Sequence, residues 1–268
     1  MLIVVKIGGD LLKEGLPHPL VNDLITLRNE HRVVLVHGGG DIVTDISTKL
    51  GHPPKFVVSP KGFKSRYTDM EESSIYTMVM AGKINKEVVI SLERNSIAAM
   101  GLSGLDAHLI KAERKKQLII IDERGRRQLI EGGYTGQIKS INVALLESIL
   151  ELGVLPVVSP IAQGDEYEAL NVDGDRTAAA IASALRADRL ILLTDVKGIM
   201  LNNILISNLT LRQAEESLEK IGSGMITKVY AATEAVKNGV KEASIASGLI
   251  ESPLSDALGH MECTVISN

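Results

Sequence analysis

The chain has 268 residues, with 29 lysines and arginines against 33 aspartates and glutamates, so its net charge at pH 7 is −4. This length fits one large α/β domain or two lobes that share a sheet, and it needs no disulfide or structural metal to fold. The single cysteine, Cys263, excludes an internal disulfide and a thiolate zinc site. The mildly acidic balance argues against general nucleic-acid binding. The sequence has no apolar run long enough for a membrane span and no signal-peptide pattern at its start. We therefore expect a cytoplasmic protein that binds neither nucleic acid nor membrane.

Short apolar runs alternate with amphipathic stretches along the chain, and aromatic residues make up only 3 % of it. This alternation predicts a buried parallel sheet with right-handed crossovers and helices on both faces. The apolar runs predict strands at Leu2–Ile7, 32–36, 96–100, 154–159, Arg189–Thr194 and 240–246. The stretches between them predict helices at 19–29, 41–50, 70–94, 142–152, 175–186, 211–221 and 225–238. The expected fold class is α/β, a three-layer αβα sandwich with a mainly parallel central sheet.

One region, at about residues 108–137, breaks this alternation. Short apolar runs at 109–112, 118–121 and 128–130 surround a polar turn at 123–126, which is typical of antiparallel hairpin strands. Further along, Pro160 and the polar residues 163–166 interrupt the pattern again. We therefore expect one lobe over residues 1–165, which contains the hairpin region, and a second over 166–268.

Glycines follow two of the predicted strands and precede one predicted helix. The first strand ends in Lys6-Ile7-Gly8-Gly9, the second in His37-Gly38-Gly39-Gly40, and Gly222-Ser223-Gly224 precedes the helix from Met225. Glycine lets backbone N–H groups approach an anion, and the start of a helix adds a favourable dipole. Each loop alone is equally typical of a tight turn. Three such loops, two of them beyond the carboxyl ends of strands, favour an anion-binding site.

Two lysines and an aspartate lie close to these loops in the sequence. Lys6 ends an apolar strand, where an unpaired ammonium group is costly. Lys228 lies one turn into the helix that follows the third loop. Solvent-exposed lysines and, for Asp175, a simple helix N-cap are the alternative interpretations. The functional hypothesis is that both lysines point at a phosphate and that Asp175 accepts hydrogen bonds from both.

Six motifs occur together and in order, and each is a short polar or glycine-rich segment. They are Lys6-Ile7-Gly8-Gly9, His37-Gly38-Gly39-Gly40, Ser65-Arg66-Tyr67-Thr68-Asp69, Asn171 to Asp175, Thr194-Asp195-Val196-Lys197-Gly198 and Gly224-Met225 to Lys228. The set resembles the amino acid kinase family, and within it the acetylglutamate kinase branch, over residues 2–266.

Further segments are similar to the carrier-dependent members of that branch. They are Leu50-Gly51-His52-Pro53-Pro54, Gly101-Leu102-Ser103-Gly104-Leu105-Asp106, Arg114-Lys115-Lys116 and Tyr134-Thr135-Gly136. In those kinases a small acidic carrier protein of the LysW type blocks the amino group of glutamate or α-aminoadipate, and the side-chain carboxylate is phosphorylated. The resemblance implies such an enzyme in lysine or arginine biosynthesis, with ATP and with Mg²⁺ bound mainly through the nucleotide. An N-acetylglutamate kinase and a non-catalytic amino-acid sensor of the same fold are the alternatives.

The resemblance also implies an acceptor-substrate lobe over residues 1–165, a nucleotide-binding lobe over 166–268 and a role for each matching residue. Lys6 and Lys228 are expected to stabilise the transferring phosphoryl group, and Asp175 to hold both lysines. The expected acceptor-binding residues are Gly39, Gly40, Arg66 and Asn171. The expected nucleotide-binding residues are Gly8, Gly9, Gly38, Thr194, Asp195, Gly198, Met200, Gly224 and Met225. Of these, Gly8, Gly9 and Gly38 are expected to offer backbone N–H donors to the phosphates. Asp10 and Asp41 depart from the family's pattern, and both add negative charge beside this expected phosphate site.

An acidic carrier requires a basic landing surface near the acceptor site. One candidate segment contains Lys55, Lys61, Lys64 and Arg66 and has no acidic residue between positions 54 and 69. The predicted hairpin region adds Arg114-Lys115-Lys116, Arg124, Arg126 and Arg127. Ordinary solvated turns are the alternative interpretation of these charges. By analogy with the branch, we expect a homodimer.

Overall fold

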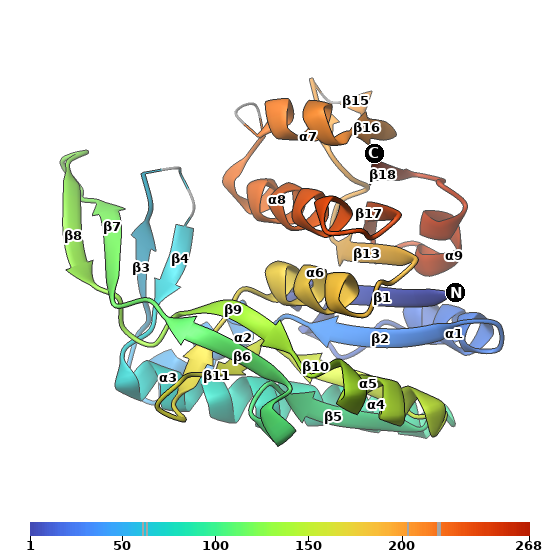
Figure 1. Cartoon of the computed structure of the whole chain (residues 1–268), viewed down its shortest axis with the longest axis horizontal. Helices are drawn as coiled ribbons and strands as arrows, with labels where there is room; N and C mark the ends of the chain where they lie inside the picture. Colours follow the sequence, from blue (N-terminus) through green and yellow to red (C-terminus); the bar gives the residue numbers. More distant parts are fainter. Residues whose placement is uncertain (61, 63, 203, 219–220) are drawn as a thin grey trace.

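The computed structural model of the chain describes residues 1–60, 62, 64–202, 204–218 and 221–268. Within these residues, eight strands form one sheet in the order β16-β18-β17-β13-β1-β2-β10-β5 (Figure 1). Neighbouring strands run parallel, except for the antiparallel pair β17 and β18. The strands are β1 (Leu2–Ile7), β2 (Arg32–His37), β5 (Ala99–Ser103), β10 (Leu155–Ser159), β13 (Arg189–Thr194), β16 (Asn208–Thr210), β17 (Glu242–Ser247) and β18 (Cys263–Ser267).

The strands divide their side chains between two hydrophobic cores, one on each face of the sheet. In β1, Val4 belongs to the first core and Val5 to the second, because successive side chains of a strand point to opposite faces. Lys6 therefore points to the same face as Val4. The same alternation in β2 sends Val36 to the first face and His37 to the second. Lys6 and His37, the buried polar residues of these two strands, thus lie on different sides of the sheet.

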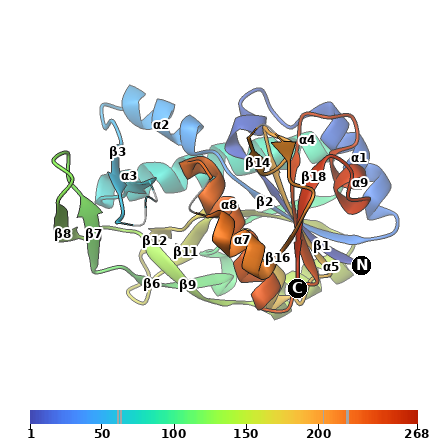
Figure 2. The same ribbon diagram turned by 90° about the horizontal axis from the view of Figure 1, so that it is seen from above.

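Helices cover both cores, so the predicted three-layer αβα class is confirmed (Figure 2). The first core is covered by α5 (Val143–Glu151), α6 (Gly174–Ala184), α7 (Leu211–Ser217) and α8 (Ser223–Lys237). The second is covered by α1 (His18–Arg28), α2 (Gly40–Lys49), α3 (Met70–Thr77), α4 (Asn85–Arg94) and α9 (Pro253–Leu258). The helix predicted at 70–94 is α3 and α4, joined through a π-helical segment, Met78–Ile84. Short 3₁₀ segments lie at Gly9–Leu12 and Asp106–His108.

Smaller sheets lie beside the central one. A four-stranded sheet has the order β12-β11-β6-β9, and three strand pairs complete the described part of the chain. The four strands of this sheet are β6 (Ile110–Arg114), β9 (Gly136–Ile141), β11 (Ile161–Gln163) and β12 (Ala169–Asn171). The three pairs are β3 (Lys55–Val58) with β4 (Lys64–Tyr67), β7 (Gln117–Ile121) with β8 (Arg127–Glu131), and β14 (Met200–Leu201) with β15 (Ile204–Leu205).

The hairpin region differs from its prediction in one respect. The runs predicted at 118–121 and 128–130 pair antiparallel as β7 and β8. The run predicted at 109–112 belongs instead to β6, which pairs with β9 and β11. The central sheet takes strands from both sides of residue 165, and the division into two lobes there stays a prediction. None of the helices in the described ranges has the length and apolar character needed to cross a bilayer.

His37 closes the carboxyl end of β2 with a buried polar network. Its Nδ1 lies 3.0 Å from the Gly38 carbonyl oxygen, and the Asn85 side-chain amide lies 3.2 Å from its Nε2. The same amide donates to the Val157 carbonyl oxygen at 2.9 Å. These partners assign the proton of a neutral imidazole to Nδ1. Burial lowers the pKa of His37 to about 4, and the nearby charge of Lys6 acts in the same direction.

This network makes the stability of the protein depend on pH. The pKa of His37 falls from 6.5 to about 4 on folding, so the unfolded state takes up its proton first as the pH decreases. The stability that the neutral His37 imidazole contributes to the free energy of unfolding is fully present above pH 6.5. About 2 kcal/mol of this contribution is lost by pH 5. We expect His37→Gln to lose less stability than the wild type between pH 7 and pH 5, measured by urea unfolding. Equal losses in both proteins would contradict this assignment.

Candidate active site

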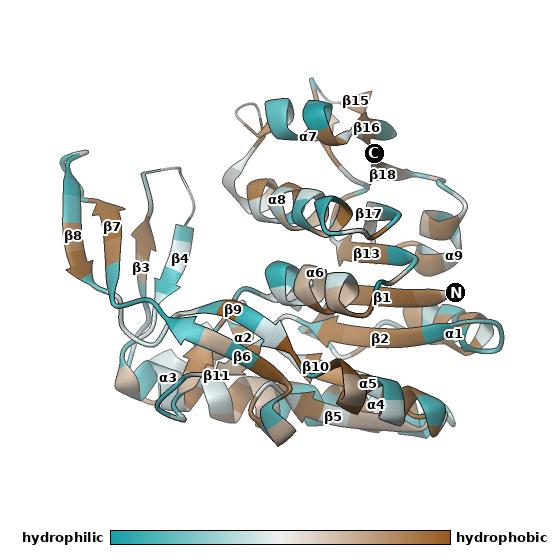
Figure 3. Cartoon of the chain, viewed as in Figure 1, coloured by the Kyte–Doolittle hydropathy of each residue, from teal (hydrophilic) through white to brown (hydrophobic). Residues whose placement is uncertain are grey.

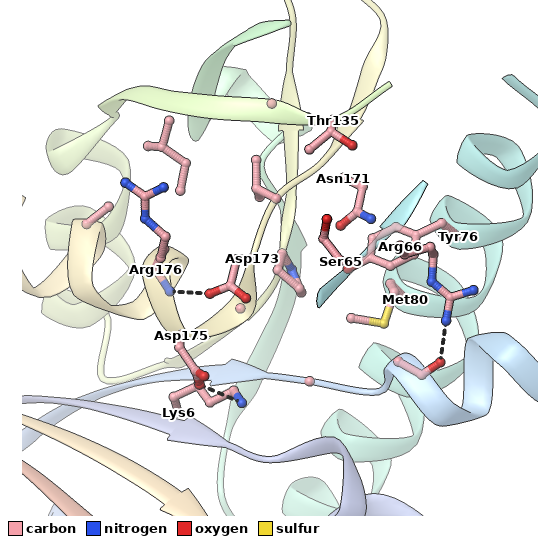
Figure 4. A pocket seen from close by; sticks show the side chains of 18 of the residues that line it. Lys6, Ser65, Arg66, Tyr76, Met80, Thr135, Asn171, Asp173, Asp175 and Arg176 are labelled. Carbon is pink, nitrogen blue, oxygen red and sulfur yellow. Dashed lines mark hydrogen bonds and ion pairs between the residues drawn. The ribbon is translucent and has the colours of Figure 1, made fainter. Parts of the chain in front are cut away.

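A cavity of about 780 Å³ lies at the carboxyl ends of β1 and β2. Lys6, the glycine loops and the first turn of α6 form one wall. Strands β4 and β9 and the segment before α6 form the other, and Figure 4 shows Thr135 and Asn171 there, across from Lys6 and Asp175. Of the residues predicted for the site, those that line this cavity are Lys6, Gly9, Gly38, Gly39, Gly40, Arg66, Asn171 and Asp175.

Asp175 lies between the two lysines that the sequence analysis singled out. Its Oδ1 is 2.7 Å from Lys6 Nζ, and its Oδ2 is 3.4 Å from Lys228 Nζ. The Thr227 hydroxyl donates to the same Oδ2 at 3.4 Å. This arrangement follows from the fold, because Lys6 points toward the face that α6 covers and Asp175 lies in the first turn of α6.

The charges of this cluster are maintained despite its burial. Lys6 is 7 % exposed and Asp175 is 4 % exposed. Burial disfavours both charged forms, but the attraction between the two groups outweighs it. The pKa of Lys6 is therefore above its usual value, and the pKa of Asp175 is below its own. Two ammonium groups against one carboxylate give these three residues a net charge of +1.

The first two glycine loops touch each other, and this contact requires glycine. A Cβ atom at Gly9 would lie 2.7 Å from the backbone nitrogen of Gly39, and one at Gly38 would lie 2.8 Å from that of Gly9. Gly39 also has a φ of +151°, and a Cβ there would lie 2.2 Å from Ile84 Cδ1. The loops can therefore form a backbone-lined wall only with glycines at these positions.

The hydrogen bonds of these loops differ from the expected ones. The N–H of Gly8 donates to the Leu193 carbonyl oxygen at 3.0 Å, and that of Gly38 donates to the Ile7 carbonyl oxygen at 2.8 Å. Both amides are thus used by the sheet, and Gly8 and Gly38 shape the loop instead of offering N–H groups to a ligand. The first turn of α2, from Gly40, supplies amides without an intrahelical acceptor at this wall.

The two acidic departures from the family pattern share one lysine. Lys13 Nζ lies 2.6 Å from Asp10 Oδ1 and 2.8 Å from Asp41 Oδ2. Hydrogen bonding to Lys13 lowers the pKa of Asp10, and the charge of Lys228 acts in the same direction. Lys13 therefore offsets one of the two extra negative charges beside the glycine loops.

Arg66 lines the cavity but is held by a buried carboxylate. Its Nη1 lies 2.5 Å from Glu72 Oε1, and its Nη2 donates to the Gly40 carbonyl oxygen and to Thr44 Oγ1, both at 2.7 Å. Glu72 is 1 % exposed and also accepts a hydrogen bond from Ser47 at 3.0 Å. Acceptor binding by Arg66 stays a prediction. The structure adds a buried partner, Glu72, that no spacing in the sequence had indicated.

The opposite wall carries uncharged polar groups. Asn171 Nδ2 donates to Thr68 Oγ1 at 2.9 Å, and the Asn171 N–H donates to the Tyr134 carbonyl oxygen at 2.9 Å. Thr135 Oγ1 is buried, and it has no hydrogen-bond partner among the residues that the structure describes. Thr135 belongs to the motif Tyr134-Thr135-Gly136, but no role was predicted for it.

Asp173 is a second carboxylate at this site. One of its oxygens caps α6 by accepting the N–H of Arg176 at 2.8 Å, and its side chain is open to the cavity. The surrounding protein and the nearby charge of Asp175 raise its pKa. Arg176 makes two hydrogen bonds to the carboxylate of Glu234, at 3.0 and 3.1 Å.

The remaining predicted residues lie on the β13 side of β1, away from the lining of this cavity. Thr194 ends β13 and donates to Asp195 Oδ1 at 3.0 Å. Gly198 has a φ of +156°, and Met200 begins β14 with its side chain exposed. Gly224 and Met225 lie in the first turn of α8, the helix that also carries Lys228. Among the predicted residues on this side, Lys228 is the one that the described structure connects to the buried cluster.

The model of the amino acid kinase family matches residues 1–247. The chain belongs to the amino acid kinase family. A Sulfolobus acidocaldarius protein named LysW-aminoadipate/LysW-glutamate kinase is 50 % identical over 260 residues, which cover 96 % of this chain and 97 % of the relative. A Cenarchaeum symbiosum protein, which carries the same name in provisional form, is 53 % identical over 267 residues and 100 % of both chains.

A solved structure shows the same fold as this member of the amino acid kinase family. The Streptococcus mutans protein smu.665 superimposes with a TM-score of 0.81 at 25 % sequence identity, over 99 % of this chain and 98 % of that one. The resemblance seen in the sequence motifs is therefore confirmed at the level of family and fold.

Proposed function

We propose that this protein is an ATP-dependent kinase that phosphorylates the side-chain carboxylate of a carrier-linked α-aminoadipate or glutamate in the cytoplasm. The product is an acyl phosphate for lysine or arginine biosynthesis. The observation that carries the proposal is the buried cluster of Lys6, Asp175 and Lys228 beside two glycine loops. The names of relatives at 50 and 53 % identity support the choice of acceptor.

The residue types of the cluster suit phosphoryl transfer to a carboxylate. An oxygen of the acceptor attacks the γ-phosphorus, the bond to the β-phosphate oxygen breaks, and ADP leaves. The acceptor carboxylate is already ionised at pH 7, so the reaction needs no general base. The transition state is loose and spreads negative charge over the transferring oxygens. Lys6 and Lys228 stabilise that charge, and Asp175 fixes both ammonium groups before the reaction begins.

The nucleotide takes the β13 side of the cluster in this proposal. Its base and ribose lie against the loop from Thr194 to Met200, and its phosphates extend past the first turn of α8 toward Lys6 and Lys228. Mg²⁺ would be held mainly through the nucleotide and would offset part of the charge of its phosphates. The net positive charge of the buried cluster suits a Mg²⁺-nucleotide, which remains anionic.

The two hairpins provide the proposed docking surface for the acidic carrier. The β3–β4 and β7–β8 hairpins stand side by side beyond the main body, and β3 contacts β7 (Figures 1 and 2). Their apolar strands carry the exposed residues Phe56, Ile119 and Leu129 (Figure 3). The exposed basic residues around them are Lys55, Lys64, Lys116, Arg124, Arg126 and Arg127. Apolar contacts framed by basic charges suit a small acidic protein. Lys61 lies outside the described residues, and a homodimer remains our expectation for the assembly.

A hydroxylamine-trap assay with Mg-ATP tests the proposed function. We expect an acyl phosphate from carrier-linked aminoadipate or glutamate, and little from N-acetylglutamate. Efficient turnover of N-acetylglutamate alone would make the protein an acetylglutamate kinase. Binding of an amino acid without any turnover would favour a sensor of the same fold.

The two lysines of the cluster are expected to be essential for turnover. Lys6→Met and Lys228→Met each remove a donor to the developing charge, and we expect each to lower kcat roughly 100- to 1,000-fold, or about 2.7–4 kcal/mol. Lys241→Met, at an exposed lysine, is the matched control and should leave kcat unchanged. Thermal unfolding checks that each variant is folded. Near-normal kcat in folded Lys6→Met and Lys228→Met would refute their assignment.

Charge reversal on the hairpins tests the docking surface. We expect Lys116→Glu combined with Arg127→Glu to weaken carrier binding strongly, because both positions are exposed and face an acidic partner. Nucleotide affinity should hardly change. Arg94→Glu combined with Lys241→Glu, at two exposed positions outside the hairpins, makes the same change in net charge and is the control. Calorimetric titration with the carrier and with Mg-ATP separates the two effects. Unchanged carrier affinity would remove the hairpins from the interface.

A further inference from the structure

One buried carboxylate stands directly behind the wall of the cavity. Glu72, in α3, is 1 % exposed and does not itself line the cavity. Its Oε1 lies 2.5 Å from Arg66 Nη1, and its Oε2 accepts the Ser47 hydroxyl at 3.0 Å. Replacing a buried ion pair by apolar side chains of similar volume is often neutral or stabilising. Stability alone therefore does not account for a buried ion pair at this place.

The guanidinium of Arg66, which is carried by β4, is fixed by three other elements. Besides Glu72 in α3, it contacts α2, where Nη2 donates to the Gly40 carbonyl oxygen and to Thr44 Oγ1, both at 2.7 Å. On β3, the centre of the Phe56 ring lies 5.1 Å from Arg66 Cζ. The position and the orientation of the guanidinium are therefore set before any ligand binds.

These contacts leave part of the guanidinium unused. A guanidinium has five N–H donors, and Glu72, Gly40 and Thr44 accept three of them. In the described part of the chain, the Nε–H and one N–H of Nη1 have no acceptor. Arg66 lines the cavity, so these two donors are available to a ligand there (Figure 4).

We infer that Glu72 is a positioning residue that holds the guanidinium of Arg66 in the orientation required to bind the acceptor. The inference rests on the proposed function, in which Arg66 is an acceptor-binding residue. Glu72 acts only through Arg66, because it is buried behind the wall and does not line the cavity. Fixing Arg66 in advance removes the entropy cost of ordering a long side chain when the acceptor binds.

The negative charge of Glu72 acts on the acceptor in the opposite direction. The acceptor carries carboxylates, so a second carboxylate behind the wall repels it. If Glu72 served only as a counter-charge, its neutralisation would strengthen acceptor binding. If Glu72 positions Arg66, loss of its contact with Arg66 weakens acceptor binding. The two roles therefore predict opposite changes in KM for the acceptor.

Three variants of Glu72 separate its position from its charge. Glu72→Ala removes the contact with Arg66, and we expect KM for the carrier-linked acceptor to rise about 10- to 100-fold, which is the range for one hydrogen bond to a charged group. Glu72→Gln keeps an oxygen for Arg66 without the charge and should keep most of the affinity. Glu72→Asp keeps the charge but is shorter by one methylene, so it should lose more affinity than Glu72→Gln. The contact acts equally in ground state and transition state, so kcat and KM for ATP should stay near the wild-type values.

The order of these variants decides between the two roles. A lower acceptor KM in Glu72→Gln, with no change in Glu72→Asp, would show that Glu72 acts by its charge and would overturn the inference. This comparison holds even if Glu72→Ala does not fold. An acceptor KM within twofold of wild type in folded Glu72→Ala would also overturn it.

A double variant tests whether Glu72 acts through Arg66. In an Arg66→Met background, Glu72→Ala should raise the acceptor KM little further, because both changes remove one interaction. The double variant also leaves no unpaired charge of this pair in the protein. Additive effects would assign Glu72 to the general structure of the cavity wall and would overturn the positioning role.

Asp23→Asn is the matched control for loss of a buried carboxylate. Asp23 is 7 % exposed and accepts the N–H groups of Leu254 and Ser255 outside the cavity lining, so KM for acceptor and for ATP should stay unchanged. Thermal unfolding checks that each variant is folded. If the wild type turns over N-acetylglutamate alone, or binds an acceptor without turnover, the proposed function fails. KM or Kd for that ligand then still tests Glu72 with the same variants.

Discussion

The ion pair between Lys6 and Asp175 is the interaction on which the site depends. A lysine at the end of a buried parallel strand is costly unless a carboxylate meets it. The pleat of β1 points Lys6 toward the face that α6 covers, and Asp175, in the first turn of that helix, lies 2.7 Å away. Lys228 then reaches the same carboxylate from α8. Three elements that are distant in the sequence are thus held together at one point by charge.

The contact between the two glycine loops is the second constraint. Gly9 and Gly38 lie so close that a side chain on either would collide with the other loop. This approach brings the end of β1 next to the start of α2. The start of α2 in turn receives the Arg66 side chain, which Glu72 holds from α3. The wall that faces the proposed phosphoryl group is therefore rigid before any ligand binds, as catalysis by positioning requires.

The sequence predicted the parts of the fold that depend on local pattern. The strand bounds Leu2–Ile7 and Arg189–Thr194 are as predicted, because long β-branched and leucine-rich runs fit a strand buried on both faces. The β3–β4 hairpin was missed because Lys55–Val58 is short and half exposed. Strand β18 and helix α9 were also missed, since they are stabilised by packing against β17 and α1 more than by their own pattern.

The same distinction holds for the candidate site. Lys6, Asp175 and Lys228 lie beside glycine loops, so the sequence motifs predicted them as site residues. The structure places these three residues in contact. The sequence did not predict the partner of Arg66, because Glu72 meets it only where β4 and α3 come together in the fold. Lys115 and Lys116 look alike in the sequence, and the structure alone shows that Lys115 lines the cavity while Lys116 is exposed.

The charged cluster and the opposite wall of the cavity are built on different parts of this fold. Lys6, Asp175 and Lys228 stand on the central sheet and on the helices that cover its first core, where packing fixes their positions. Lys115 and Thr135 stand on the small sheet and loops beside it, next to the projecting hairpins. Changes in the hairpins and the small sheet can therefore reshape the opposite wall, while the charged cluster remains intact. Under the proposed function, phosphoryl transfer and acceptor recognition would be carried by these separate parts of the fold.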